Sequence, residues 1–244
     1  MRFIDKQIVC KPLQRRRHNP PQTDTDAKKA WRRFNKQAIR KTCYKQQFGL
    51  CAYTELSLDD EQLGCHLEHI APRSRYPERT FESTNIILAS MDECYSGQLE
   101  THEQFGGHFK SALYGDDWFI GPFDPRCELF FQYCATTGRV FANDKIDIND
   151  QANTARTIEV LNLNCDYLIT KRRDHLRALT EAINSLMSRG SQNFNTEETN
   201  FESLRRVTLE KVGKSLPVFY SAKKQLFDKY KKDGFSKNHP PLNT

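Results

Sequence analysis

The stretch HLEHIAPRSRYPERTFESTNIILAS, residues 66–90, opens with two histidines around a glutamate and closes on an apolar, β-branched run. The closing segment STNIILAS (83–90) is typical of a buried strand. Residues 51–70 are compatible with short strands, and Pro72 can end the last of them. The stretch therefore predicts short strands, with Glu68 and His69 at the point where one of them ends.

Glu68 and His69 together suit the hydrolysis of a phosphodiester bond. A histidine can take a proton from the attacking water because its pKa lies near neutrality. A carboxylate with an imidazole or an amide can hold a divalent ion, which stabilises charge on the phosphate. Neighbouring side chains on a strand point to opposite faces, so the pair must lie where the strand twists as it ends. Each residue alone is common on surfaces and in cores, and their order along the chain is the stronger signal.

The charge balance permits nucleic-acid binding without requiring it. The 244 residues include 37 Lys and Arg against 31 Asp and Glu, so the net charge is +6. A solvated helix face explains the basic clusters at 15–17, 32–33 and 171–173 equally well. No stretch approaches the ~18 apolar residues of a membrane span, and the first residues lack the apolar segment of a signal peptide. We therefore expect a cytoplasmic protein without membrane contact.

The cysteines predict free thiols. There are eight of them, and no two lie three residues apart. In a reducing cytoplasm we expect few or no disulfides. The spacing also excludes a zinc site built from C-x-x-C pairs.

Outside 66–90 the patterns predict helices around one hairpin. Residues 1–24 are expected to form an extended basic arm, followed by a helix over about 26–48 that Asp24 or Thr25 caps. The segment LFFQYCATTGRVFAN (129–143) predicts a β-hairpin, and 98–113 is expected to be partly helical. Helical periodicity continues in TARTIEVLNL, in DYLITKRRDHLRALTEAINSLMSR, and near 198–212 and 217–232.

Four segments in this order resemble the HNH endonucleases. They are LCAYTE (50–55), HLEHIAPRS (66–74), TNIILAS (84–90) and GGHFK (106–110). More narrowly, they resemble the PtuB-like proteins of Septu and retron anti-phage defence systems. Supporting similarity extends over about 28–180 and includes AWRRFNKQAIRKTCYKQQFGLCAY, FIGPFDP, TTGRV and TIEVLNLN.

The resemblance implies a ββα-metal site and assigns roles within it. His69 matches the general base and Glu68 the acidic metal ligand beside it. Asn85 matches the asparagine that braces the loop, and His108 matches the second metal ligand. His102 competes with His108, which is favoured because GGHFK keeps the glycine and lysine around it.

The resemblance also bears on two cationic residues and on the family's zinc ligands. Lys110 and Arg73 are expected to contact the nucleic acid. The family's zinc-binding cysteine pairs are broken, because Thr54, Ser90 and Gly107 stand where thiolates are expected. We therefore expect no structural Zn²⁺, with apolar packing in its place. The residues that could hold a residual site are Cys51, Cys65, Cys94 and His66.

The expected architecture is α+β and mostly helical, with a ββα-metal (HNH) core flanked by helices and a β-hairpin. It divides into a basic N-terminal arm (1–24), the HNH nuclease core with its preceding helix and the hairpin (25–145), and a helical C-terminal region (146–244). The arm is the expected contact with a partner, so deleting 1–22 is expected to weaken that contact and spare the fold. The helices after 165 are the other candidate.

The resemblance implies a metal-dependent endonuclease that cleaves nucleic acid with Mg²⁺ or Mn²⁺ as the effector of a defence complex. Its expected partners are an ABC-type ATPase (PtuA-like) and, in retron systems, a reverse transcriptase with its RNA or DNA product. Two alternatives stay open. One is a catalytically decayed subunit that still binds nucleic acid, and the other is a helical interaction protein with incidental histidines.

Overall fold

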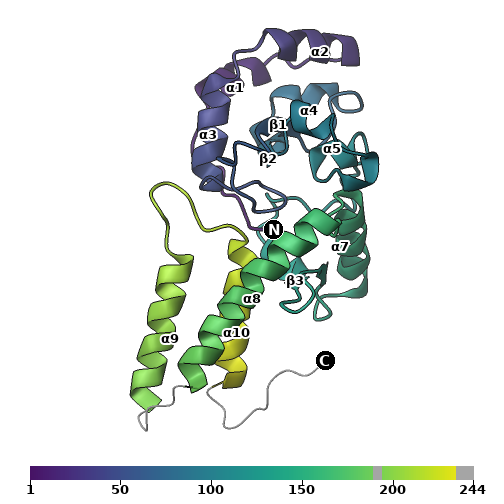
Figure 1. The fold of residues 1–244 in the computed structure, drawn as a ribbon. Coiled ribbons are helices and arrows are strands. Elements are labelled where there is room, and N and C mark those ends of the chain that lie inside the picture. The colour runs from purple at the N-terminus through teal and green to yellow at the C-terminus, as the bar shows by residue number, and fades with distance from the viewer. Residues whose placement is uncertain (189–193, 235–244) are drawn as a thin grey trace.

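The computed structural model describes residues 1–188 and 194–234 (Figure 1). It is an α+β fold with about 50% helix and two small antiparallel sheets. The first sheet lies among α1 to α5, and the second lies beside the long helices of the C-terminal third. Buried apolar side chains of both parts form one hydrophobic cluster that includes Leu13, Ile87 and Phe227. The expected α+β class is confirmed.

The first sheet forms from the two ends of the 66–90 stretch, as its pattern predicts. β1 (Cys65–His69) pairs antiparallel with β2 (Ile86–Ser90), and Leu67 faces Leu88 in the register. All five residues of β2 are buried, which explains its continuous apolar run. Two short 3₁₀ helices, η1 (Pro77–Phe81) and η2 (Ser83–Asn85), lie between the strands and return the chain to β2.

The N-terminal residues are folded against the core, so the expected extended arm is wrong. They form α1 (Lys11–Arg17), which has proline in its first turn. Ile4 and Leu13 are 2% and 3% exposed. The amide of Ile4 donates to the carbonyl of Pro122 at 2.7 Å. Burial of a few apolar residues among many charges therefore fixes this segment.

The helix expected over 26–48 is two helices, α2 (Asp24–Arg33) and α3 (Gln37–Gln47). The hydroxyl of Thr23, rather than Asp24 or Thr25, caps α2 by accepting from the amide of Asp26. The chain turns extended at Phe34, and the side chain of Asn35 accepts from the amide of Gln37 at 2.9 Å. This local hydrogen bond competes with a continuous helix and accounts for the break.

The remaining elements follow the predicted order. After β2 come α4 (Glu93–Ser96), η3 (Thr101–Glu103) and α5 (Gly107–Lys110). The hairpin expected at 129–143 is present as β3 (Phe131–Tyr133) and β4 (Val140–Ala142), preceded by α6 (Cys127–Phe130). The C-terminal third consists of α7 (Ile148–Val160), α8 (Asp166–Ser188), α9 (Phe194–Leu209) and α10 (Tyr220–Gly234).

The last three helices lie against one another, and α10 contacts the 50–55 loop through Glu55. α8, α9 and α10 contact each other pairwise (Figure 1). The Glu55 carboxylate accepts from the amide of Ser221 at 2.7 Å and lies 3.3 Å from the Met1 ammonium. One buried carboxylate therefore joins the N-terminal segment, the 50–55 loop and the start of α10. None of the helices described here has the length and apolar character needed to cross a membrane.

Candidate functional site

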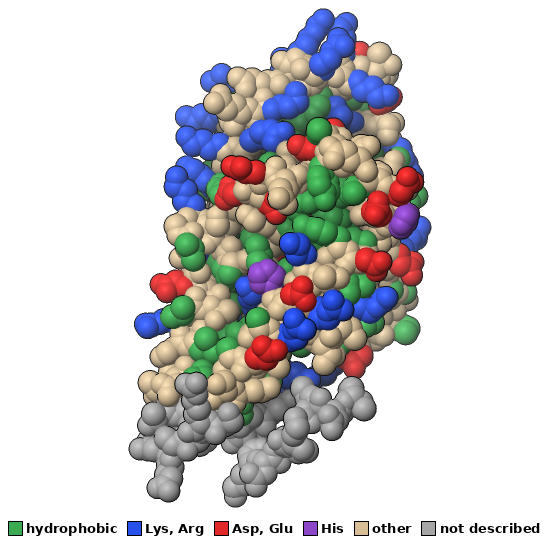
Figure 2. Space-filling view, in the orientation of Figure 1, with side chains coloured by type: hydrophobic (Ala, Val, Ile, Leu, Met, Phe, Trp, Pro, Cys, Tyr) green, Lys and Arg blue, Asp and Glu red, His purple; other side chains and the backbone are tan. Residues whose placement is uncertain are grey.

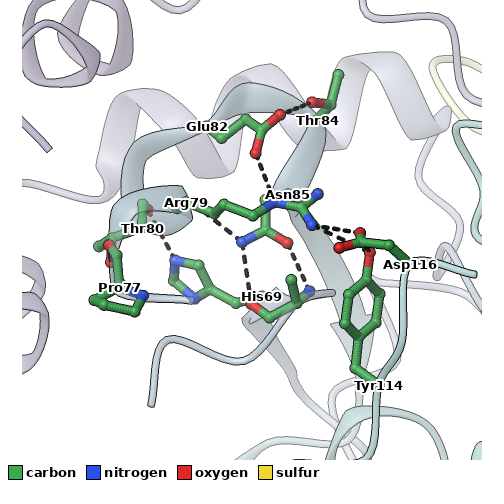
Figure 3. A network of polar contacts seen from close by, with 10 residues as sticks. His69, Pro77, Arg79, Thr80, Glu82, Thr84, Asn85, Tyr114 and Asp116 are labelled. Carbon is green, nitrogen blue, oxygen red and sulfur yellow. Dashed lines mark hydrogen bonds and ion pairs between the residues drawn. The ribbon is translucent and has the colours of Figure 1, made fainter. Parts of the chain in front are cut away.

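His69 lies at the end of β1 with its ring held in one orientation (Figure 3). Its Nε2 atom is 3.0 Å from the carbonyl oxygen of Thr80. A carbonyl can only accept, so in the neutral ring Nε2 carries the proton and Nδ1 keeps the lone pair. The ring also packs edge-on against Trp31, with centroids 4.5 Å apart. The free lone pair on Nδ1 is what a general base requires.

The surroundings of His69 keep its ring neutral. Burial and the positive charge of Arg73 lower the pKa of His69 to about 4, although the Thr80 carbonyl and the Glu68 carboxylate act in the opposite direction. The side chain is therefore unprotonated throughout the physiological pH range and able to accept a proton.

Asn85 braces the loop that follows His69, and it is fully buried. Its Oδ1 atom accepts from the amide of Ala71 at 2.6 Å. Its Nδ2 atom donates to the carbonyls of Ala71 and Arg79, both at 3.1 Å (Figure 3). These bonds hold both ends of the 70–79 loop against the start of β2, so Asn85 fixes the backbone around His69.

Arg79 ties the same loop to the segment after α5. Its guanidinium donates to the carboxylates of Glu82 at 2.8 Å and Asp116 at 2.7 Å, and to the hydroxyl of Tyr114 at 3.2 Å (Figure 3). No local pattern predicts this arrangement, because the partners lie up to 37 residues apart. Arg79 therefore joins the 70–79 loop to the segment that carries Tyr114 and Asp116.

Glu68 points to the other face of β1 and is paired with Lys110. Its Oε1 atom lies 3.2 Å from the Lys110 ammonium, and Oε2 lies 3.5 Å from Nε2 of His66. Burial alone would raise the pKa of Glu68, but the charge of Lys110 and the hydrogen bond with His66 outweigh it and lower the pKa to about 2. Glu68 is therefore an ionised carboxylate at neutral pH.

His66 and His108 complete the group around Glu68. The rings of the two histidines have centroids 4.4 Å apart. Both face the carbonyl oxygen of Met91, through Nδ1 of His66 at 2.6 Å and Nε2 of His108 at 3.2 Å. From the motifs, His66 is expected only as a possible residual zinc ligand. The signal that could have found it is the spacing, because residues i and i+2 of a strand share a face.

The chemistry of this group fits a divalent ion. Because Nδ1 of His66 donates to Met91, a neutral His66 presents the lone pair of Nε2 to the Glu68 carboxylate. Two lone pairs 3.5 Å apart require a cation or a proton between them. The separation is close to that of two ligands of a tetrahedral ion, each bound at about 2.1 Å, and the two atoms would move closer to bind an octahedral ion such as Mg²⁺. A proton is the other solution, since Glu68 and the Met91 carbonyl outweigh the effect of burial and raise the pKa of His66.

The metal-binding arrangement is not complete as it stands. Within residues 1–188 and 194–234, no three or more His, Cys, Asp or Glu side chains already have the spacing of a metal site. His108 is turned to the Met91 carbonyl, and Lys110 neutralises one oxygen of Glu68.

Gly107 lets α5 begin directly against Glu68. A Cβ atom at this position would lie 2.5 Å from the carboxyl carbon of Glu68, closer than such atoms ever approach. The preceding Gly106 has φ 64°, a conformation that favours glycine. The two glycines of GGHFK therefore place His108 and Lys110 beside β1.

The other expected site residues are placed as follows. Lys110 is 0% exposed and also donates to the carbonyl of Ile70 at 3.1 Å, so the expected contact with nucleic acid is not available to it. Arg73 is half-buried, with its guanidinium 5.6 Å from the ring centroid of Trp31. His102 is exposed on η3, whereas His108 lies against His66.

Two of the residues that stand where the family has zinc-binding cysteines form a hydrogen bond with each other. The hydroxyls of Thr54 and Ser90 are buried and lie 3.2 Å apart. The expected replacement by apolar packing is therefore wrong in part, since this contact is polar. Cys51 is buried, Cys65 half-buried and Cys94 exposed, and all eight cysteines are free thiols.

Comparison with known proteins adds no assignment. No family model matches the chain, and no curated protein is significantly similar to it. We therefore infer the function from the geometry around β1 and from the motifs of the sequence.

Proposed function

We propose that this protein is a metal-dependent endonuclease of the HNH type, which hydrolyses phosphodiester bonds of nucleic acid. The observation that carries the proposal is the hydrogen bond between His69 and the carbonyl of Thr80. It leaves Nδ1 of a neutral imidazole free at the end of a strand, and the other face of that strand carries Glu68 and His66. A base and an anionic ligand group on adjacent residues are what such a hydrolysis requires.

Each residue then has a distinct task. Nδ1 of His69 takes the proton of the water that attacks the phosphorus. Asn85 keeps the loop after His69 in place, and Lys110 keeps Glu68 ionised. Glu68, His108 and His66 would hold Mg²⁺ or Mn²⁺, which when bound would stabilise negative charge on the phosphate and the leaving oxygen.

The wider setting follows from the motifs alone. In this proposal β1, β2 and α5 form the ββα-metal core, and the protein acts in the cytoplasm with an ABC-type ATPase in anti-phage defence. The N-terminal segment is part of the folded core, so the exposed faces of the helices after 165 become the preferred contact with the ATPase.

One observation favours the alternative of a non-catalytic nucleic-acid-binding subunit. Lys110 already neutralises Glu68, and His108 faces a backbone carbonyl. A site that has lost its ion would have this arrangement, because the buried carboxylate needs a positive partner.

Nicking of a supercoiled plasmid by the full-length chain with Mg²⁺ or Mn²⁺ separates these two functions. We expect nicking by the wild type and by His102→Ala, which changes an exposed histidine, and loss of nicking in His69→Ala. Plasmid binding should persist in His69→Ala. If the wild type binds the plasmid but leaves it intact even with its ATPase partner present, the non-catalytic function is correct.

A further inference from the structure

Positive charge is concentrated in residues 11–47, which include α1, α2 and α3. This segment contains 12 of the 37 Lys and Arg but only 2 of the 31 Asp and Glu. Its net charge of +10 exceeds the +6 of the whole chain, so the remaining residues are net negative. The modest overall charge therefore conceals a strongly basic surface.

These cations are exposed and almost free of acidic partners. Eleven of the twelve are exposed, the exception being the half-buried Lys36. Among the described residues, Lys28 alone of the eleven has an ion pair, with Asp24 at 2.6 Å. By contrast, the C-terminal helices neutralise their own cations, as in the pairs of Lys224 with Asp228 and Lys231 with Glu202.

The cations also gather in space. Figure 2 shows Lys and Arg side chains over the top and upper left of the molecule, where Figure 1 places α1, α2 and α3. We call this the basic face, and define it by its exposed members. They are Lys11, Arg15, Arg16, Arg17, Lys28, Lys29, Arg32, Arg33, Arg40, Lys41 and Lys45.

The basic face reaches the candidate base through Trp31. This indole lies edge-on to His69, and the cationic groups of Lys36 and Arg73 lie 5.2 and 5.6 Å from its ring centroid. Burial and the like charges of Arg73 and Arg40 lower the pKa of Lys36. Mutual repulsion of these cations is relieved when an anion binds among them.

We propose that the basic face binds the phosphate backbone of a nucleic-acid duplex, and that Lys36 and Arg73 guide that backbone to His69. The last part rests on the proposed function, because it takes His69 as the base. Unpaired, exposed Lys and Arg on adjoining helices are the electrostatic footprint of backbone binding.

Two absences within 11–47 favour a duplex over other polyanions. No Phe, Tyr or Trp side chain of this segment is exposed, whereas single strands are bound largely by stacking bases on such rings. No large apolar side chain of the segment is exposed either, and a helix that lies in a membrane surface needs such a face.

Duplex affinity as a function of salt tests the proposal. The protein is the full-length chain carrying His69→Ala, so that the DNA stays intact, and the probe is a fluorescein-labelled 30-base-pair DNA. One variant carries Arg16→Gln, Arg17→Gln, Lys29→Gln and Arg33→Gln on the basic face. The matched control carries Lys171→Gln, Arg177→Gln, Lys229→Gln and Lys232→Gln on α8 and α10, and so removes the same charge.

Fluorescence anisotropy between 50 and 200 mM NaCl gives the slope of log affinity against log salt. This slope is negative, and we expect its magnitude to be smaller in the basic-face variant by about 2 to 4, since each lost contact with duplex DNA contributes about 0.9. The control should keep the wild-type slope, and both variants should keep the wild-type melting temperature. Equal changes in both variants would overturn the proposal, because net charge alone would then explain binding.

Further probes test other binding partners, and the nicking assay separates the duplex-binding surface from the proposed nuclease activity. The duplex assignment would be overturned if the protein bound single-stranded DNA more tightly than the duplex. It would also be overturned if the basic-face variant lost binding to phosphatidylserine vesicles while its duplex binding stayed unchanged. If the wild type does not nick plasmid but duplex affinity depends on the basic face, the proposed nuclease activity is wrong and the proposed duplex-binding surface is correct. If the wild type nicks plasmid and the basic-face variant keeps the wild-type salt slope, the nuclease activity is correct and the duplex-binding surface is wrong.

Discussion

The ammonium of Lys110 lies 3.2 Å from Oε1 of Glu68, and the lysine side chain is 1% exposed. Each charge is tolerated in this position because the other is present. Removing one partner of a buried pair leaves an uncompensated charge and costs about 3–5 kcal/mol. Glu68→Ala therefore tests stability as well as metal binding, and the two effects must be separated.

Lys110→Met should lower the free energy of unfolding by about 3 kcal/mol at pH 7, because Glu68 loses its nearest positive partner. Urea denaturation followed by circular dichroism measures the change. The double variant with Glu68→Gln should recover part of the loss, since no buried charge remains. Lys45→Met, on the exposed side of α3, is the matched control and should be near neutral. A loss below about 1 kcal/mol in Lys110→Met would show that the pair contributes little.

His69→Ala should reduce nicking by about 10²–10⁴-fold, because the proton of the attacking water then has no positioned acceptor. Duplex affinity should change little. Initial rates on supercoiled plasmid, with anisotropy on the same preparations, measure both quantities. Activity at the wild-type level would remove His69 from the mechanism.

The buried, neutral His69 should make stability depend on pH. Its pKa is about 4 in the folded protein and about 6.5 when unfolded. Between these values the unfolded state binds the proton more readily, so stability is lost as the pH falls below about 6.5. The loss attributable to His69 is about 2 kcal/mol by pH 5. Urea denaturation at pH 7 and pH 5 should show a smaller loss in His69→Gln than in the wild type, and equal losses would contradict the assignment.

Gly107→Ala should destabilise the protein by about 1–3 kcal/mol and impair nicking, because its Cβ would overlap the Glu68 carboxyl group. Gly121→Ala is the control, since its Cβ would meet nothing closer than 3.8 Å. Thermal unfolding of the two variants measures the difference. A melting temperature of Gly107→Ala equal to that of the control would mean that α5 can move away from β1 without cost.

Deleting residues 1–22 should unfold the core rather than spare it. The deletion removes Ile4 and Leu13, which are nearly fully buried, and exposes the surfaces that they cover. Loss of the cooperative unfolding transition measures this outcome. Contact with an ATPase is better tested by surface substitutions on α8 and α10, scored by co-purification of the two proteins.

The sequence predicted those features that depend on local patterns. The strand pair around 66–90, the hairpin at 129–143 and the C-terminal helices follow from periodicity and turn residues, which act over a few positions. Thr23 and Asn35 show the limit of such patterns, because one side-chain hydrogen bond moved a cap and divided a helix.

The candidate site was less accessible to sequence reasoning. The order of motifs indicated Glu68, His69 and Asn85 as candidates, and strand periodicity could have added His66. The burial of Lys110 depends on how α5 packs against β1, more than 40 residues away in the chain. A lysine two residues after a histidine carries no information about that contact.

The hydroxyl pair of Thr54 and Ser90 joins two segments of the core with atoms that the chain itself supplies. A hydrogen bond of this kind has no affinity threshold for an ion and no oxidisable sulfur. Chelators and oxidants that disrupt metal–thiolate sites therefore leave it unchanged. The contact between these two segments therefore depends on neither a bound metal nor the redox state of a sulfur atom.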